Sequence, residues 1–101
     1  MPVHRDCERH QPRGYRYHFR NHVPVDEIRR LWQRAVAECE KRFGSYHVRR
    51  YTSHTLHADE HVLTIAARTE VGQTLNVIFQ SAIPPHWLRS VAPLRSHRAA
   101  A

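Results

Sequence analysis

The clearest pattern in the chain is a run of apolar residues at three- and four-residue steps that begins after Pro24. Acidic residues stand at its start, where the helix dipole favours negative charge, and Gly44 follows its last apolar position. This spacing predicts one amphipathic helix that ends at Gly44. Its apolar stripe consists of Val25, Ile28, Leu31, Trp32, Ala35, Val36, Cys39 and Phe43.

Four other stretches are typical of strands, because apolar and polar residues alternate in them or because they are rich in β-branched and aromatic residues. In residues 15–20 the aromatic residues fall on one side, and Arg16, His18 and Arg20 fall on the other. The other predicted strands are residues 45–56, 61–69 and 74–82, with turns over 58–60 and 70–73 and one helical turn over 86–91.

This order of elements predicts an α+β fold of the form β-α-β-β-β, in which one amphipathic helix packs on a four-stranded, mainly antiparallel sheet. We expect Trp32 on the helix and Phe79 on the last strand to be buried against each other's elements. Val62, Ala66 and Ile78 fall on the sheet face away from the helix. We therefore expect a two-fold homodimer, or the segment around residues 87–88, to shield them.

The length of 101 residues allows one hydrophobic core. Residues 1–14 are predicted to form a flexible basic arm, residues 15–91 a single α+β domain, and residues 92–101 a frayed basic tail. No apolar run reaches the roughly 18–20 residues that span a bilayer, and the N-terminus is too polar for a secretory signal. We expect no membrane contact and a cytoplasmic location.

Charge points to an anionic partner. Sixteen basic residues against nine acidic ones give a formal net charge of +7, and ten histidines can add to it in mild acid. Lys41 is the only lysine, so the basic residues are almost all arginines, whose planar guanidinium suits phosphate and carboxylate. A genome rich in G and C also explains the excess of arginine over lysine, but it does not explain the net charge.

If the predicted helix covers one sheet face, the other face is rich in arginine and histidine and has one aromatic platform. Such a face has the residue types that bind phosphates and stack on bases. The same pattern also fits a solvated face of a basic protein. The predicted nucleic-acid-binding residues are Arg16, His18, Arg20, His47, Arg49, Tyr51 and Arg68, with Asn76 and Gln80 beside them.

The leading interpretation is a small non-enzymatic module that binds nucleic acid or a nucleoprotein complex. One alternative is an inhibitor or adaptor that binds an acidic protein surface, such as a phage-encoded blocker of a host nucleoprotein machine. Another is a metal-independent RNase toxin that uses histidine for proton transfer and arginine for transition-state charge. The order of elements resembles that of small RelE- and ParE-like toxins; this resemblance covers element order alone, and no catalytic residue is carried over from it.

Two clusters of possible metal ligands lack the close paired spacing that zinc sites need. We therefore predict no metal and no cofactor. Cys39 lies on the apolar stripe, so we expect an inert core residue. The two clusters are Cys7 and His10 with His18 and His22, and His54 and His57 with His61.

Overall fold

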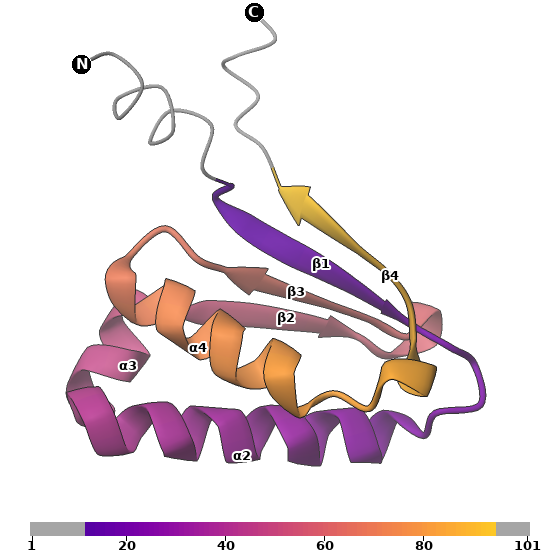
Figure 1. Ribbon diagram of the computed structural model, residues 1–101, viewed down its shortest axis with the longest axis horizontal. Helices are drawn as coiled ribbons and strands as arrows, with labels where there is room; N and C mark the ends of the chain where they lie inside the picture. The colour runs from indigo at the N-terminus through magenta and orange to yellow at the C-terminus, as the bar shows by residue number, and fades with distance from the viewer. Residues whose placement is uncertain (1–11, 95–101) are drawn as a thin grey trace, which may run out of the picture.

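The computed structural model describes residues 12–94 as three α-helices and a four-stranded antiparallel sheet (Figure 1). The α+β class is therefore confirmed. The elements are β1 (Gly14–Phe19), α2 (Val25–Phe43), α3 (Ser45–Tyr51), β2 (Ser53–His57), the 3-10 turn η1 (Ala58–Glu60), β3 (Val62–Ala66), α4 (Glu70–Ala82), the 3-10 turn η2 (Pro85–Trp87) and β4 (Leu88–Leu94).

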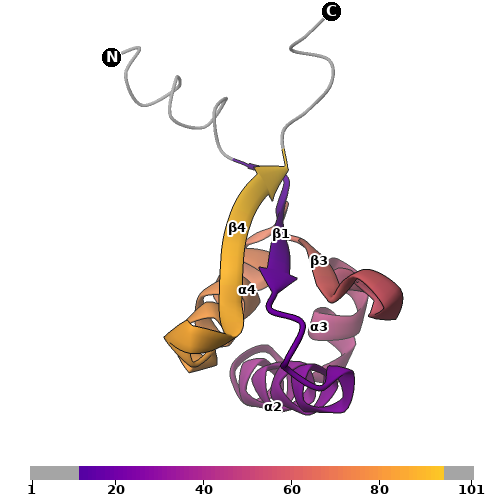
Figure 2. The same cartoon turned by 90° about the vertical axis from the view of Figure 1, so that its right-hand side faces the viewer.

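The strand order is β2-β3-β1-β4, and every neighbouring pair is antiparallel. Helices α2 and α3 connect β1 to β2, β3 lies between these two strands, and α4 connects β3 to β4. This connectivity is the split βαβ, or ferredoxin-like, arrangement. The helices lie on one side of the sheet (Figure 2). No helix of residues 12–94 covers the other face, which we call the open face.

Helix α2 agrees with the sequence prediction at both ends. Pro24 occupies the N-cap position, and Asp26 and Glu27 stand in the first turn. Gly44 follows the last residue with φ of 87°, a value that glycine adopts without steric cost. The buried stripe is Ile28, Leu31, Trp32, Ala35 and Cys39.

The predicted strand over residues 74–82 is wrong, because these residues belong to α4. Leu75, Val77 and Phe79 alternate as in a strand, but Val77 is 59 % exposed while the other two are fully buried. The buried positions Val71, Leu75 and Phe79 instead follow four-residue helical steps. The predicted hairpin loop over residues 70–73 is the first turn of this helix.

The predicted strand over residues 45–56 is also wrong in its first half. Helix α3 occupies Ser45–Tyr51, and β2 follows it. Val48 is the one buried residue of α3, so tertiary packing of a single apolar side chain decides the conformation of this segment. The single helix of the predicted β-α-β-β-β order is therefore replaced by three helices.

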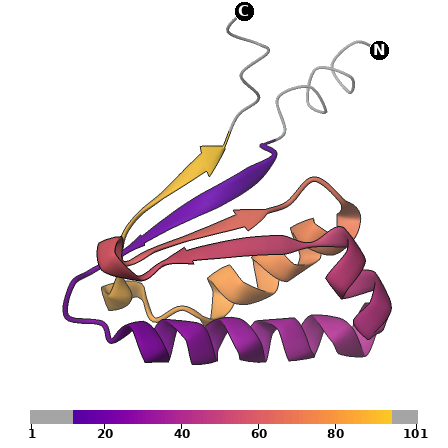
Figure 3. The same cartoon turned by 180° about the vertical axis from the view of Figure 1, so that it is seen from behind.

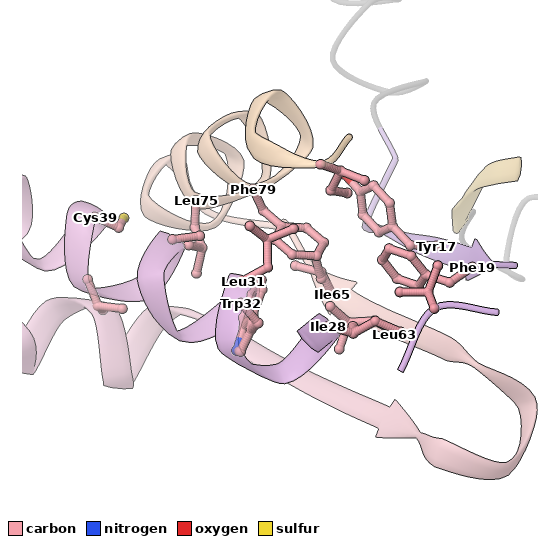
Figure 4. Close-up of a cluster of buried hydrophobic side chains, with 14 of the residues drawn as sticks. Tyr17, Phe19, Ile28, Leu31, Trp32, Cys39, Leu63, Ile65, Leu75 and Phe79 are labelled. Atoms are coloured by element: carbon pink, nitrogen blue, oxygen red, sulfur yellow. The ribbon is translucent and has the colours of Figure 1, made fainter. Parts of the chain in front are cut away.

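The core lies between the helices and the sheet (Figure 4). As expected, Trp32 and Phe79 are buried in contact, with ring centroids 5.2 Å apart, although Phe79 comes from a helix rather than a strand. The Phe79 ring also meets Tyr17 edge-on at 5.2 Å. The buried Tyr17 hydroxyl donates a hydrogen bond to Asn76 Oδ1, which joins β1 to α4.

Val62, Ala66 and Ile78 were expected to be shielded by a second copy or by the segment around residues 87–88, and the structure places them differently. Val62 is buried and Ala66 half-buried within the single chain, and Ile78 lies on α4 against the core rather than on the sheet. The segment at Trp87 and Leu88 packs against the core from the helix side. Of the predicted tail, residues 92–94 belong to β4; residues 1–11 and 95–101 lie outside the described residues. Across residues 12–94, no helix has both the length and the apolar character to cross a membrane.

Candidate nucleic-acid interface

The solvent-facing side of α3 carries a row of aromatic rings. Tyr46 and Tyr51 are 67 % and 42 % exposed, and His47 lies between them with ring centroids 5.6 and 5.9 Å away. The Arg50 guanidinium lies 5.8 Å from the centroid of the Tyr51 ring, within range of a cation–π interaction. We call Tyr46, His47, Arg50 and Tyr51 the α3 row. Exposed aromatic side chains that are grouped on one surface are typical of binding sites.

The local sequence explains why these side chains face outward. Gly44 turns the chain between α2 and α3, and Val48 alone anchors α3 to the core. The hydroxyl of Thr52 donates to the Val48 carbonyl and closes the C-terminal end of the helix. The remaining α3 side chains are consequently left on the surface.

Next to the α3 row is a hollow of about 450 Å³ that contains two arginines and no acidic residue. It lies where α3, the start of β2 and the loop between β3 and α4 meet, and we call it the arginine hollow. Arg50 and Arg68 lie on its wall together with Tyr51. Its lining is Arg50, Tyr51, Thr52, Ser53, Ala66, Arg68 and Thr69.

Thr69 holds this region together. Its hydroxyl donates to the Tyr51 carbonyl at 2.8 Å and accepts from the Gly72 amide at 3.0 Å, so it caps α4 and ties that helix to the end of α3. Gly72 permits the close approach, because a Cβ there would lie 3.0 Å from both Ala66 O and Ala67 Cα. These contacts fix Arg68 beside Tyr51.

The open face of the sheet continues from the arginine hollow. Arg16 lies opposite Thr64 on β3 and Ala92 on β4, and His18 lies opposite Val62 and Ser90. Ala66, which lines the hollow, is the diagonal neighbour of Arg16 on the same face of the sheet, within reach of a long side chain.

Ion pairing distinguishes these arginines from Arg29 and Arg30 of α2. The three ion pairs among residues 12–94 all lie within α2 and join Arg29 to Asp26, Arg30 to Glu27 and Lys41 to Glu38. None of them involves Arg16, Arg49, Arg50 or Arg68, and Glu70 at the start of α4 is not paired with Arg68. Within the described range, these four arginines are available to an external anion.

The structure brings only some of the predicted site residues together. Arg16 and His18 lie on the open sheet face as predicted, and Arg20 is exposed just beyond the end of β1. Tyr51 and Arg68 meet in the arginine hollow. The remaining positions were placed on the wrong element: His47 and Arg49 lie with Tyr51 on α3, and Asn76 and Gln80 lie on α4.

Tyr46 and Arg50 were not predicted, because in a strand over residues 45–56 they alternate with His47, Arg49 and Tyr51 and fall on the other face. A helical period centred on Val48 would have placed both on the surface.

The other candidate chemistry of the sequence does not assemble in the described residues. Across residues 12–94, no three His, Cys, Asp or Glu side chains lie close enough together to hold a metal ion; Cys7 and His10 lie outside this range. Cys39 is fully buried, as predicted, and burial raises the pKa of its thiol. His54 packs against Trp32, with ring centroids 4.8 Å apart, and desolvation lowers its pKa.

The arginine hollow thus adjoins the α3 row through Arg50 and Tyr51 and the sheet through Ala66. No protein-family model, curated protein sequence or solved structure matches this chain.

Proposed function

We propose that this protein is a small non-enzymatic module that binds single-stranded nucleic acid, alone or within a nucleoprotein complex. The observation that carries the proposal is the α3 row opening onto the arginine hollow. Exposed aromatic rings stack on unpaired bases, whereas guanidinium groups neutralise phosphates. The two kinds of group lie side by side here, as a strand with alternating bases and phosphates requires.

The aromatic row favours single strands over a duplex. Bases in a duplex are already stacked on one another, so exposed rings gain nothing from it, while phosphates are available in both forms. Some single-strand binders stack bases on aromatic residues of an open sheet face. The described open face here has no Phe, Tyr or Trp side chain, so in this proposal it supplies Arg16 and His18 to the backbone, and α3 supplies the tyrosine rings.

The test is fluorescence anisotropy with labelled random single-stranded DNA, single-stranded RNA and duplex DNA at several salt concentrations. Replacing Tyr46 and Tyr51 by Ala is expected to weaken single-strand binding by about 30-fold or more, since two stacked bases at roughly 1–3 kcal/mol each contribute about 2–6 kcal/mol together. Duplex binding should change much less. Replacing Arg50 and Arg68 by Ala should weaken binding to all three probes and flatten their salt dependence.

A matched control changes the same number of arginines elsewhere. Arg30→Ala with Arg34→Ala removes two charges from the exposed surface of α2 and should leave binding largely unchanged. Equal loss in this control and in the Arg50 and Arg68 variant would contradict the proposed site.

Absence of nucleic-acid binding by the wild type at moderate salt would favour instead an acidic protein partner for the same arginines. Cleavage of RNA without added metal, lost on replacing His18 or His47, would overturn the non-enzymatic part of the proposal.

A further inference from the structure

The edge strand β2 differs from most of the surface because it carries no formally charged residue. It is hydrogen-bonded to β3 on one side, and no described strand pairs with its other side (Figure 3). Natural sheets commonly protect such edges with charged residues, prolines or bulges. The opposite edge strand β4 has this protection in Pro93 and in Arg89, which the register leaves unpaired. Strand β2, Ser53–His57, has none of it.

A hollow beside β2 is suited to an apolar side chain. It has a volume of about 320 Å³, lies between the edge strand and α2, and is lined by Arg29, Trp32, Gln33, Val36 and His54. A smaller hollow of about 70 Å³ shares Trp32 and His54 with it and is also lined by Leu56. Arg29, the charged residue of this lining, is already paired with Asp26 at 2.9 Å. The hollow therefore presents aromatic and aliphatic side chains beside a neutralised cation.

We propose that two copies of this chain pair through β2, antiparallel about a two-fold axis at Thr55, to form one continuous sheet. This register pairs all five residues of the strand and sets His54 opposite the partner's Leu56. Both residues belong to the helix-side face of β2, since His54 contacts Trp32 and Leu56 packs against the core. The partner's Leu56 consequently comes to lie beside the hollow lined by Trp32 and Val36, and the symmetry axis repeats this contact in the other copy.

Charge favours a second copy as the occupant. Two chains of formal charge +7 repel each other over most of their surfaces, but residues 51–58 form a stretch without Asp, Glu, Lys or Arg. Pairing through β2 brings no formally charged strand residues face to face. An acidic partner would find its complement on the α3 row and the open sheet face, not here.

Sedimentation equilibrium over the micromolar range tests the pairing directly. The wild type is expected to be a reversible dimer, and Thr55→Lys should raise its dissociation constant at least about tenfold, because two lysines would then meet at the symmetry axis. Ser90→Lys places the same charge on the exposed part of β4 and should leave the dimer intact. Circular dichroism checks that both variants are folded.

A cross-link tests the register. In a Cys7→Ser background, which leaves the buried Cys39 as the native thiol, Thr55→Cys should form a disulfide-linked dimer on mild oxidation. Residues directly opposite in an antiparallel pair have Cβ atoms about 4.5–5.5 Å apart, close to the range that a disulfide bridges. Ser90→Cys should not cross-link efficiently. A wild type that stays monomeric, or a dimer that Thr55→Lys leaves unchanged, would overturn the proposal.

Discussion

At the residue scale, one buried polar pair joins the sheet to α4. Tyr17 and Asn76 are both almost fully buried, and burial raises the pKa of the tyrosine hydroxyl, which therefore stays a hydrogen-bond donor. Tyr17→Phe leaves the Asn76 oxygen buried without this donor and should lower the free energy of unfolding by about 1–3 kcal/mol. Urea denaturation measures the loss.

The companion variant separates the hydrogen bond from the packing. Adding Asn76→Leu to Tyr17→Phe removes both polar partners, so the double variant should recover part of the lost stability. If Tyr17→Phe is as stable as the wild type, the pair does not contribute to the fold.

His54 predicts a pH dependence of stability at the same scale. Desolvation against Trp32 lowers its pKa in the folded state, so the unfolded state binds the proton more readily. The stabilising contribution of the neutral ring is present above the ordinary histidine pKa of about 6.5 and is lost as the pH falls from there through the lowered folded value. His54→Gln should therefore lose less stability than the wild type in thermal melts between about pH 7 and pH 5. Equal losses in the two proteins would show that His54 does not titrate differently on folding.

At the element scale, predictability followed the number of independent signals in each segment. Helix α2 was predictable because apolar spacing, an acidic first turn and a terminal glycine agree. Strand β1 was predictable because its alternation is strict. Helices α3 and α4 were not, because their β-branched and aromatic residues favour strands locally, and only packing of Val48 and of the Val71, Leu75 and Phe79 series selects the helix.

The same reasoning explains what was predicted of the site. His47, Arg49, Tyr51 and Arg68 became candidates because their residue types fell on the open face of predicted strands, whereas their actual grouping depends on α3 being a helix. The arginine hollow depends on a turn, a cap and a glycine contact that span three elements. Contacts between residues far apart in the sequence produce no periodic pattern from which they could be predicted.

Gly72, near the start of α4, lies close to the backbone at the end of β3. Gly72→Ala gains helix propensity of up to about 1 kcal/mol but forces a Cβ against Ala66 O and Ala67 Cα at the end of β3. These neighbours are backbone atoms, so α4 must shift, and we expect a net loss of about 1–3 kcal/mol in unfolding free energy. Ser81→Ala, at an exposed position of the same helix, should stay within about 0.5 kcal/mol of the wild type. A stabilised Gly72→Ala protein would show that the start of α4 is not held against β3.

At the scale of the whole molecule, charge is unevenly distributed. Acidic residues of α2 pair with Arg29, Arg30 and Lys41 of the same helix. Asp59 and Glu60 lie in η1, at the opposite end of β2 from the arginine hollow. The end of the molecule formed by α3 and the start of β2 keeps cations that no described acidic side chain pairs. An anionic strand should accordingly approach this end and extend from it along the open sheet face.

The last prediction concerns how far a bound single strand extends over the open sheet face. If the strand continues over the open face, replacing Arg16, His18 and Arg20 by Ala should weaken binding to all sequences alike and flatten the dependence of log K on log salt by up to about one unit per lost contact. None of the three is fully buried, so the variant should fold with an unchanged circular dichroism spectrum. Fluorescence anisotropy with a labelled single strand measures the slope of log K against log salt for this variant and for the Arg50 and Arg68 variant. If the triple variant keeps the wild-type affinity and salt dependence, no phosphate contacts these three residues. The interface would then be confined to α3 and the arginine hollow.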